Sequence, residues 1–252
     1  MLEKARYTSA RGVSLVELMV GLAVGLIVLL ATLGMYTTTS IGARNTVDSA
    51  KLNTEIRGAM DLMVEDIRRA GFCSPGDLDD CSHYNELVIR NYGSGSANCI
   101  LYSYNLDPLD ATSSTEYLGF RIDNAVWMRD GGSGDLSNCT NGSWERLTDP
   151  TKVQIYDRQP VDANDPHING FFEITYQCIP ISPTTSATDW SGACESGQTI
   201  YDWAAGLSEP AALIETRRVT IDLSGELTRD ATMHIEPIQD VLVRNHRVVE
   251  LP

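Results

Sequence analysis

The chain has 252 residues and a formal net charge of −15, with 42% hydrophobic and 21% charged residues. This length fits one ordinary globular domain with an appended element. Because an acidic surface repels phosphates, the charge disfavours a protein built to hold DNA or RNA, and we expect no nucleic acid bound directly by the chain.

The N-terminus combines a basic leader with a long apolar run. Residues 1–12 carry three basic side chains and one acid, and no charged residue occurs from Leu18 to Ala43. As a helix this run spans about 39 Å, more than the roughly 30 Å of a bilayer core. Since Lys and Arg favour the cytoplasmic side, we predict a cytoplasmic leader at 1–12, a membrane helix at 13–43 and a periplasmic domain at 72–252.

The helical pattern continues beyond the apolar run. Between residues 44 and 71, apolar side chains recur at steps of three and four, with charged residues on the other faces. The recurring positions are Ile56, Met60, Met63, Ile67 and Ala70. Gly71 supplies a C-terminal stop. The sequence therefore predicts one unbroken helix from Val13 to Ala70, about 87 Å long, with an amphipathic second half at 44–71.

After residue 71 the composition changes to short β-like runs separated by Gly, Ser, Asn, Asp and Pro. The candidate strands are 86–90, 100–104, 116–122, 125–129, 171–179, 217–223 and 240–249. The segments 131–143 and 181–199 are predicted to be loops. We expect an α+β fold, with the long N-terminal helix packed on a mostly antiparallel β-sheet domain.

All six cysteines follow the apolar run, and none forms a C-x-x-C pair. An even count beyond a membrane segment indicates disulfides rather than zinc ligands. Six cysteines allow 15 connectivities, and the sequence alone does not choose among them. Our working prediction is sequential pairing of Cys73 with Cys81, Cys99 with Cys139, and Cys178 with Cys194.

The sequence offers no recognisable catalytic motif, and we predict a protein that is not an enzyme and needs no cofactor or metal. The four histidines, His83, His167, His234 and His246, are expected to be surface or strand residues rather than ligands. The acidic stretches 77–80 and 162–165 do not match an EF-hand loop, and we interpret them as solvated turns. The tryptophans and tyrosines suit strand packing, with no basic patch among them.

The apolar run is too long for an ordinary signal peptide and has no small-x-small site after it. A cut after Gly12 fits better, and it would create an amine on Val13, four residues before Glu17. The Glu17 carboxylate could interact with the positive end of the helix dipole and with the amine of its own chain. Alternatively, it could form an ion pair with the N-terminal amine of a neighbouring helix. Gly21 and Gly25 have the spacing of close helix contacts, although membrane helices also contain such glycines without a contact.

The stretch GVSLVE at residues 12–17, followed by the apolar helix, resembles the processing motif of type IV prepilins and of type II secretion pseudopilins. The resemblance implies that a membrane aspartyl peptidase, the prepilin peptidase, cuts after Gly12 and methylates Val13, where the family usually has Phe. The family's acid at the fifth mature position matches Glu17. Residues 61–72 and 241–247 are similar to parts of PilW-type minor pilins.

The resemblance implies a pilin-like fold and a minor pilin that crosses the inner membrane once and has a periplasmic C-terminal domain. The subunit would later join the pilus (fimbrium) on the cell surface. Implied partners are other minor pilins, the major pilin and a tip adhesin, and implied roles are pilus initiation, adhesion, twitching motility or DNA uptake. A type II secretion pseudopilin of the J kind is an alternative. An alternative of another class is an enzyme or ligand-binding domain on an uncleaved signal anchor.

Overall fold

The computed structural model describes residues 12–72, 84, 86–105, 117–130, 136–181 and 212–250. The helix in this part of the chain is α1 (Leu15–Ile67), with 53 residues. The strands are β1 (Leu87–Arg90), β2 (Cys99–Ser103), β3 (Tyr117–Ile122), β4 (Val126–Asp130), β5 (Ser143–Arg146), β6 (Val153–Tyr156), β7 (Phe172–Ile181), β8 (Ala212–Asp222), β9 (Ser224–Leu227), β10 (Asp230–Ile235), β11 (Ile238–Leu242) and β12 (Arg247–Glu250).

The chain divides into two compact units, Met1–Ser49 and Ala50–Pro252, and each is described by itself. In the first unit, α1 is apolar on every side from Leu18 to Tyr36, and every large apolar side chain from Val13 to Val47 is more than half exposed. A helix that is hydrophobic all round needs lipid or other helices around it. By length and composition this helix is able to cross a membrane.

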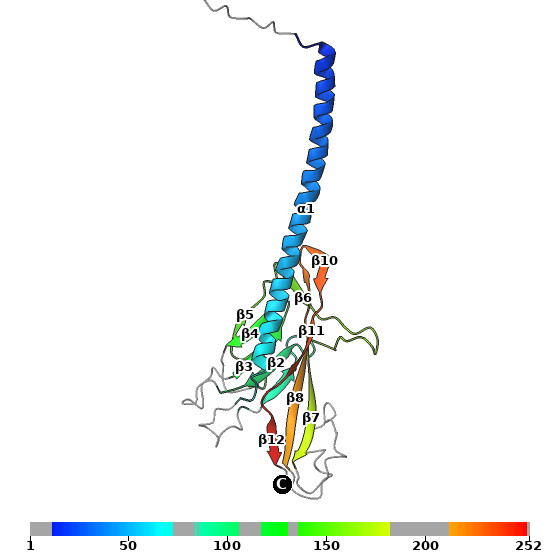
Figure 1. Cartoon of the computed structure of the whole chain (residues 1–252). Helices are drawn as coiled ribbons and strands as arrows, with labels where there is room; N and C mark the ends of the chain where they lie inside the picture. The colour runs from blue at the N-terminus through cyan, green and yellow to red at the C-terminus, as the bar shows by residue number, and fades with distance from the viewer. Residues whose placement is uncertain are drawn as a thin grey trace, which may run out of the picture. The chain divides into compact units, whose positions relative to one another are not determined.

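In the second unit, one face of α1 packs on the sheets, as the cyan part of the helix shows in Figure 1. The buried residues of this face are Leu52, Ile56, Ala59, Met60, Met63, Val64, Ile67 and Ala70. Their steps of three and four keep them on one side of the helix, while Arg57, Asp61 and Glu65 stay exposed. The predicted amphipathic pattern is therefore the pattern that builds the core.

The β-strands form three antiparallel sheets. The five-stranded sheet has the order β1-β2-β3-β4-β5, and the three-stranded sheet has the order β10-β9-β6. In the third sheet, β8 pairs with β7, β11 and β12. Alternate residues of the five-stranded sheet, such as Ile100 and Phe120, join the helix in the main core, which defines the inner face of this sheet.

The outer face of the five-stranded sheet has its own smaller cluster, formed by Cys99, Leu101, Leu136 and Cys139. Gly225 of β9 allows a close approach to the helix, because a Cβ added there would lie 2.5 Å from the Cδ1 atom of Ile56. The expected α+β fold, a long apolar N-terminal helix against antiparallel sheets, is confirmed.

Several predicted boundaries were wrong in detail. The helix begins at Leu15 and ends at Ile67, and a turn then leads to Gly71, whose φ is +78°. The predicted strand 240–249 is two strands, β11 and β12, separated by a turn. The strands β5, β6, β9 and β10 were not predicted. Residues 131–135 and 182–199, within the predicted loops, lie outside the described residues.

Candidate functional site

The predicted processing site lies immediately before the first turn of α1. Gly12, Val13 and Ser14 are not helical, and the backbone N–H of Leu18 donates to the Ser14 carbonyl at 3.1 Å. Ser14 therefore occupies the N-cap position, with Glu17 three residues later, which is the spacing of a capping box. The peptide bond between Gly12 and Val13 is exposed and outside the helix, so cleavage there would not require the helix to unwind.

Glu17 lies in the first turn of α1, where the positive end of the helix dipole favours a negative charge. Its side chain is exposed and, among the described residues, makes no ion pair or hydrogen bond. The carboxylate thus has no partner in its own helix, in which residues 18–43 carry no charge. It is available to an amine, either that of Val13 after cleavage or that of another chain.

The small residues of the first unit lie on open helix surface. A Cβ added at Gly21 or Gly25 would meet nothing within 4 Å. Because these residues are four apart, they share a helix face on which another helix could approach closely.

The polar end of the apolar helix satisfies its own hydroxyl groups. Thr32, Thr37 and Thr46 donate to the carbonyls of Leu29, Gly34 and Gly42, each at 2.9 Å. These bonds leave few unpaired polar groups on the surface, which suits a helix in lipid or among other apolar helices.

At the other end of α1, a buried carboxylate fixes the helix to β2. The phenols of Tyr102 and Tyr104 donate to the two oxygens of Asp66, at 2.5 and 2.7 Å. Burial and the neighbouring carboxylate raise the pKa of both tyrosines. The two phenols stay protonated donors, and Asp66 locks the position of the helix end on the sheet.

The end of α1 is capped by the turn between β11 and β12. The Arg244 backbone N–H donates to the Arg68 carbonyl at 3.1 Å, and Asn245 Nδ2 donates to the carbonyls of Arg69 and Ala70 at 3.0 and 3.2 Å. The carbonyl groups at the C-terminal end of a helix have no partners within the helix. Here the turn between β11 and β12 supplies the missing N–H donors. The stretches 61–72 and 241–247 are therefore in direct contact.

The second unit contains a buried polar network that the sequence did not predict. His167 was expected to be a surface or strand residue, but its Nδ1 lies 2.8 Å from Asp222 Oδ2 in a buried pair. Its Nε2 lies 3.7 Å from Glu236 Oε2, which Arg158 Nε also approaches at 3.2 Å. Asp222 is 55 residues from His167, so no local motif could indicate the pair. His234 and His246 are exposed, and His83 lies outside the described residues.

Burial raises the pKa of Asp222 from 3.8 to about 6, and the Ile168 backbone N–H opposes that rise. The Tyr156 hydroxyl donates to Glu236 Oε1 at 3.1 Å, and burial together with this carboxylate raises the pKa of Tyr156 to about 12. Since the Glu236 oxygens already accept from Arg158 and Tyr156, we interpret the network as a fixed structural element rather than an empty ligand site.

The acidic turn 162–165 is ordered by its own hydrogen bonds. Asp165 accepts from Arg158 Nη1 at 3.0 Å and from the backbone N–H groups of Val161 and His167 at 3.1 Å. A carboxylate occupied in this way is a poor calcium ligand. Among the described residues, no group of three or more His, Cys, Asp or Glu is placed to hold a metal ion. The acidic stretch 77–80 lies outside them.

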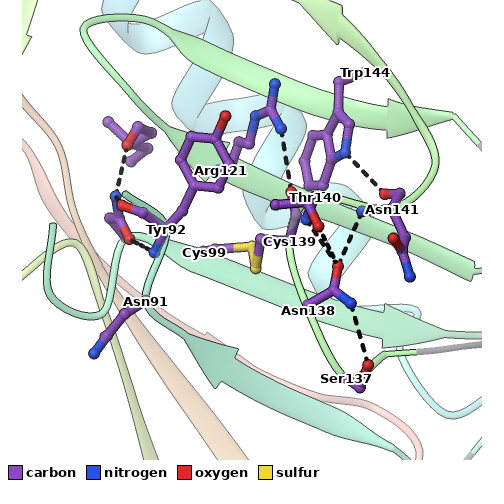
Figure 2. Close-up of a disulfide and its surroundings, with 12 residues drawn as sticks. Asn91, Tyr92, Cys99, Arg121, Ser137, Asn138, Cys139, Thr140, Asn141 and Trp144 are labelled. Carbon is purple, nitrogen blue, oxygen red and sulfur yellow. Dashed lines mark hydrogen bonds between the residues drawn. A yellow bond between two sulfur atoms is a disulfide. The ribbon is translucent and has the colours of Figure 1, made fainter. Parts of the chain in front are cut away.

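Cys99 and Cys139 form a disulfide between β2 and the segment before β5, as Figure 2 shows. This is one of the three predicted pairs, and it closes a sequence separation of 40 residues. Cys73, Cys81 and Cys194 lie outside the described residues, as does the side chain of Cys178.

Comparison with known proteins identifies the family. The family model for Prepilin peptidase-dependent protein B matches residues 45–243, which is 199 of the 252 residues. No curated protein and no solved structure matches the chain. The match begins after the apolar part of α1 and does not include residues 12–17, so it is independent of the processing motif. The chain belongs to the prepilin peptidase-dependent protein B family, a family associated with type IV pilins.

Proposed function

We propose that this protein is a minor type IV pilin of the PilW kind, a subunit without enzymatic activity that acts in pilus initiation or in the tip complex. One observation carries the proposal. The processing motif at residues 12–17 and the family match at residues 45–243 lie in separate parts of the chain, and both point to prepilin peptidase. The exposed apolar helix between them supports membrane insertion followed by packing among other pilin helices.

In this proposal, prepilin peptidase removes residues 1–12 and methylates Val13. The exposed, non-helical bond after Gly12 supports access by that enzyme. Residues 13–43 anchor the chain in the inner membrane, and the domain that follows is periplasmic. The chain then leaves the membrane for the pilus, where other minor pilins, the major pilin and a tip adhesin are its partners. Adhesion, twitching motility or DNA uptake would depend on that assembly.

The assembly role of Glu17 follows from its lack of a partner. A charge in an apolar environment is unfavourable until it is paired. At about 4 Å and an effective dielectric near 20, an ion pair with the amine of a neighbouring subunit gains about 4 kcal/mol before desolvation is subtracted. Such a pair would fix the axial register of one helix against the next. The glycine face at Gly21 and Gly25 supports close packing in that register.

Substitution of Glu17 separates an assembly role from a role in starting the helix. Because the Glu17 side chain makes no hydrogen bond among the described residues, and glutamine is also suited to this position, Glu17→Gln removes the charge and keeps the helix start. We expect Glu17→Gln to be cleaved like the wild type and to be depleted from sheared pili, as measured by immunoblotting of membrane and pilus fractions. Glu65→Gln, an exposed acid on the same helix, is the matched control. Wild-type incorporation of Glu17→Gln would contradict the pairing of subunits through Glu17.

Deletion of the gene distinguishes the remaining alternatives. We expect loss of surface pili and of twitching, with restoration by the wild-type gene. Unchanged piliation together with loss of protein secretion would instead support a pseudopilin of the J kind. If the mature chain keeps residues 1–12, the alternative of a domain on an uncleaved signal anchor is favoured.

A further inference from the structure

We propose that the outer face of the five-stranded sheet is a docking surface for a carboxylate-rich surface of a partner protein. The surface is the outer row of Arg90, Arg121, Trp127 and Arg146, and the rings of Tyr92 and Trp144 flank this row. Its existence does not depend on how the N-terminus is processed. The sequence indicated no basic patch among the aromatic residues, whereas the sheet register brings three arginines beside them.

The register aligns residues from five different strands. Arg90 pairs with Cys99, Cys99 with Arg121, Arg121 with Trp127, and Trp127 with Arg146. Neighbouring strands lie about 4.8 Å apart, so the row from β1 to β5 is about 19 Å long. The outer row therefore presents three guanidinium groups within the dimensions of a single protein contact.

The central arginine of the outer row is held between aromatic rings. The Arg121 Cζ atom lies 4.4 Å from the ring centroid of Tyr92, 4.5 Å from that of Trp144 and 5.3 Å from that of Trp127. Figure 2 shows its guanidinium beside both Tyr92 and Trp144. Arg146 in turn lies 5.9 Å from the Trp127 centroid. Cation–π contacts of this length favour the charged side chain and restrict its motion.

The disulfide adds a further restraint on Arg121. The Nη1 atom of Arg121 donates to the carbonyl of Cys139 at 3.1 Å (Figure 2). The disulfide between Cys139 and Cys99 in turn ties this carbonyl to β2. The Nε atom of Arg121 is buried and has no hydrogen-bond partner among the described residues, so a carboxylate of another molecule would not reach it. An arginine that is already held in one conformation loses little conformational entropy when it becomes part of an interface.

The charge of the outer row contrasts with that of the whole chain. Arg90 and Arg146 are exposed and make no ion pair with any described residue. The strand positions paired across this face, in the outer row and in the row beside it that contains Leu101 and Gly119, include no Asp or Glu. The chain as a whole has a net charge of −15. Local positive charge on an acidic protein is the complement of a local cluster of carboxylates.

The composition of the outer row favours a protein as the partner. Arg, Trp and Tyr are the residues most enriched where protein interfaces concentrate their binding energy, and guanidinium groups bind carboxylates with two parallel hydrogen bonds. A nucleic acid is disfavoured, because its phosphates continue beyond a strip of about 19 Å onto an acidic surface. A carboxylate cluster on a folded partner has no such excess charge.

The test uses the full-length chain in detergent and three labelled probes of equal length, namely a glutamate-rich peptide, a lysine-rich peptide and a single-stranded oligodeoxynucleotide. We expect the glutamate-rich peptide to bind with the highest affinity, as measured by fluorescence anisotropy. The double variant Arg90→Glu with Arg146→Glu should bind it at least about tenfold more weakly, the effect of two ion pairs at the edge of an interface. Both side chains are exposed, so the fold should be unchanged, which near-UV circular dichroism checks.

Arg244→Glu is the control, because Arg244 is also exposed and lies in the turn after β11, away from the outer row. It should bind the glutamate-rich peptide as the wild type does. An equal loss of affinity in the control, no binding by the wild type, or tighter binding of the oligodeoxynucleotide would each overturn the proposal. These outcomes leave the processing of residues 1–12 untouched and are distinguishable from a failure of the proposed pilin function.

Discussion

At the residue scale, the carboxyl group of Asp222 shows how burial reverses the usual effect of pH on stability. Its side chain is 2% exposed, it faces His167, and its Oδ1 has no hydrogen-bond partner among the described residues. Asp157 and Glu236 add negative charge nearby, and Arg158 adds positive charge. The pKa of Asp222 is about 6 in the folded chain and near 3.9 in the unfolded chain, so the folded chain binds the proton more tightly.

The sign of the resulting pH dependence follows from linkage. The contribution of Asp222 to the free energy of unfolding is greatest below pH 4 and is lost as the pH rises through about 6, at up to about 1.4 kcal/mol per pH unit. We expect Asp222→Asn to remove this decrease, so that the variant gains stability relative to the wild type between pH 4 and 7. Urea unfolding at several pH values measures the difference in the free energy of unfolding between this variant and the wild type. Asp61→Asn, at an exposed position, is the control. Parallel curves for wild type and Asp222→Asn would contradict the assignment.

Asp66 is the residue whose loss should weaken the junction of helix and sheet most. Asp66→Ala leaves the buried phenols of Tyr102 and Tyr104 without their acceptor. Hydrogen bonds to charged groups contribute about 1.5 to 3 kcal/mol each, so we expect a loss of about 3 kcal/mol in the free energy of unfolding. Denaturant titration measures this loss. The exposed Asp61→Ala should change stability by less than about 0.5 kcal/mol, and similar losses in both variants would argue against the role of Asp66.

At the scale of elements, the end of α1 depends on glycine at one position and not at another. Gly71 has a φ of +78°, and an added Cβ would lie 2.9 Å from Arg217 Nη2. We expect Gly71→Ala to destabilise the domain by about 1 to 2 kcal/mol, because alanine is strained in this conformation. Gly58→Ala should instead stabilise it by about 0.5 to 1 kcal/mol, since an added Cβ there meets nothing within 4 Å. Thermal unfolding measures both, and equal shifts in the same direction would contradict this account.

The sequence predicted those elements that carry a clear apolar pattern. The buried helix residues Ile56, Met60 and Met63 recur at steps of three and four. The central strands β2, β3 and β4 are short runs rich in apolar and aromatic residues, and β2 is buried at every position. β5 could not be recognised, because its residues are mostly exposed and carry no alternation. β9 is short and contains Gly225, which the packing of Ile56 requires and which reads locally as a turn.

The functional residues also divide into those that the sequence could reveal and those that it could not. The processing motif is contiguous, so Gly12, Val13 and Glu17 were recognisable as a group from the sequence. The outer row and the pair of His167 with Asp222 were not, because each joins residues that meet only through the sheet register or across 55 positions of the chain. Local pattern reveals sites within one element, and tertiary packing makes the others.

At the scale of the whole molecule, the chain combines an exposed apolar helix with a β domain of a prepilin peptidase-dependent family. The disulfide between Cys99 and Cys139 suits an oxidising compartment, and with it the proposed periplasmic side of the membrane. The assembly role of Glu17 requires that residues 1–12 are removed and that a free amine remains on Val13.

The mass of the mature N-terminus tests this requirement most directly. The chain is purified from cells with and without prepilin peptidase, and its N-terminal peptide is measured by mass spectrometry. We predict a start at Val13 carrying one methyl group when the peptidase is present, and retention of residues 1–12 when it is absent. A chain that keeps its leader in both cells, or is cut after the apolar run, would contradict the account.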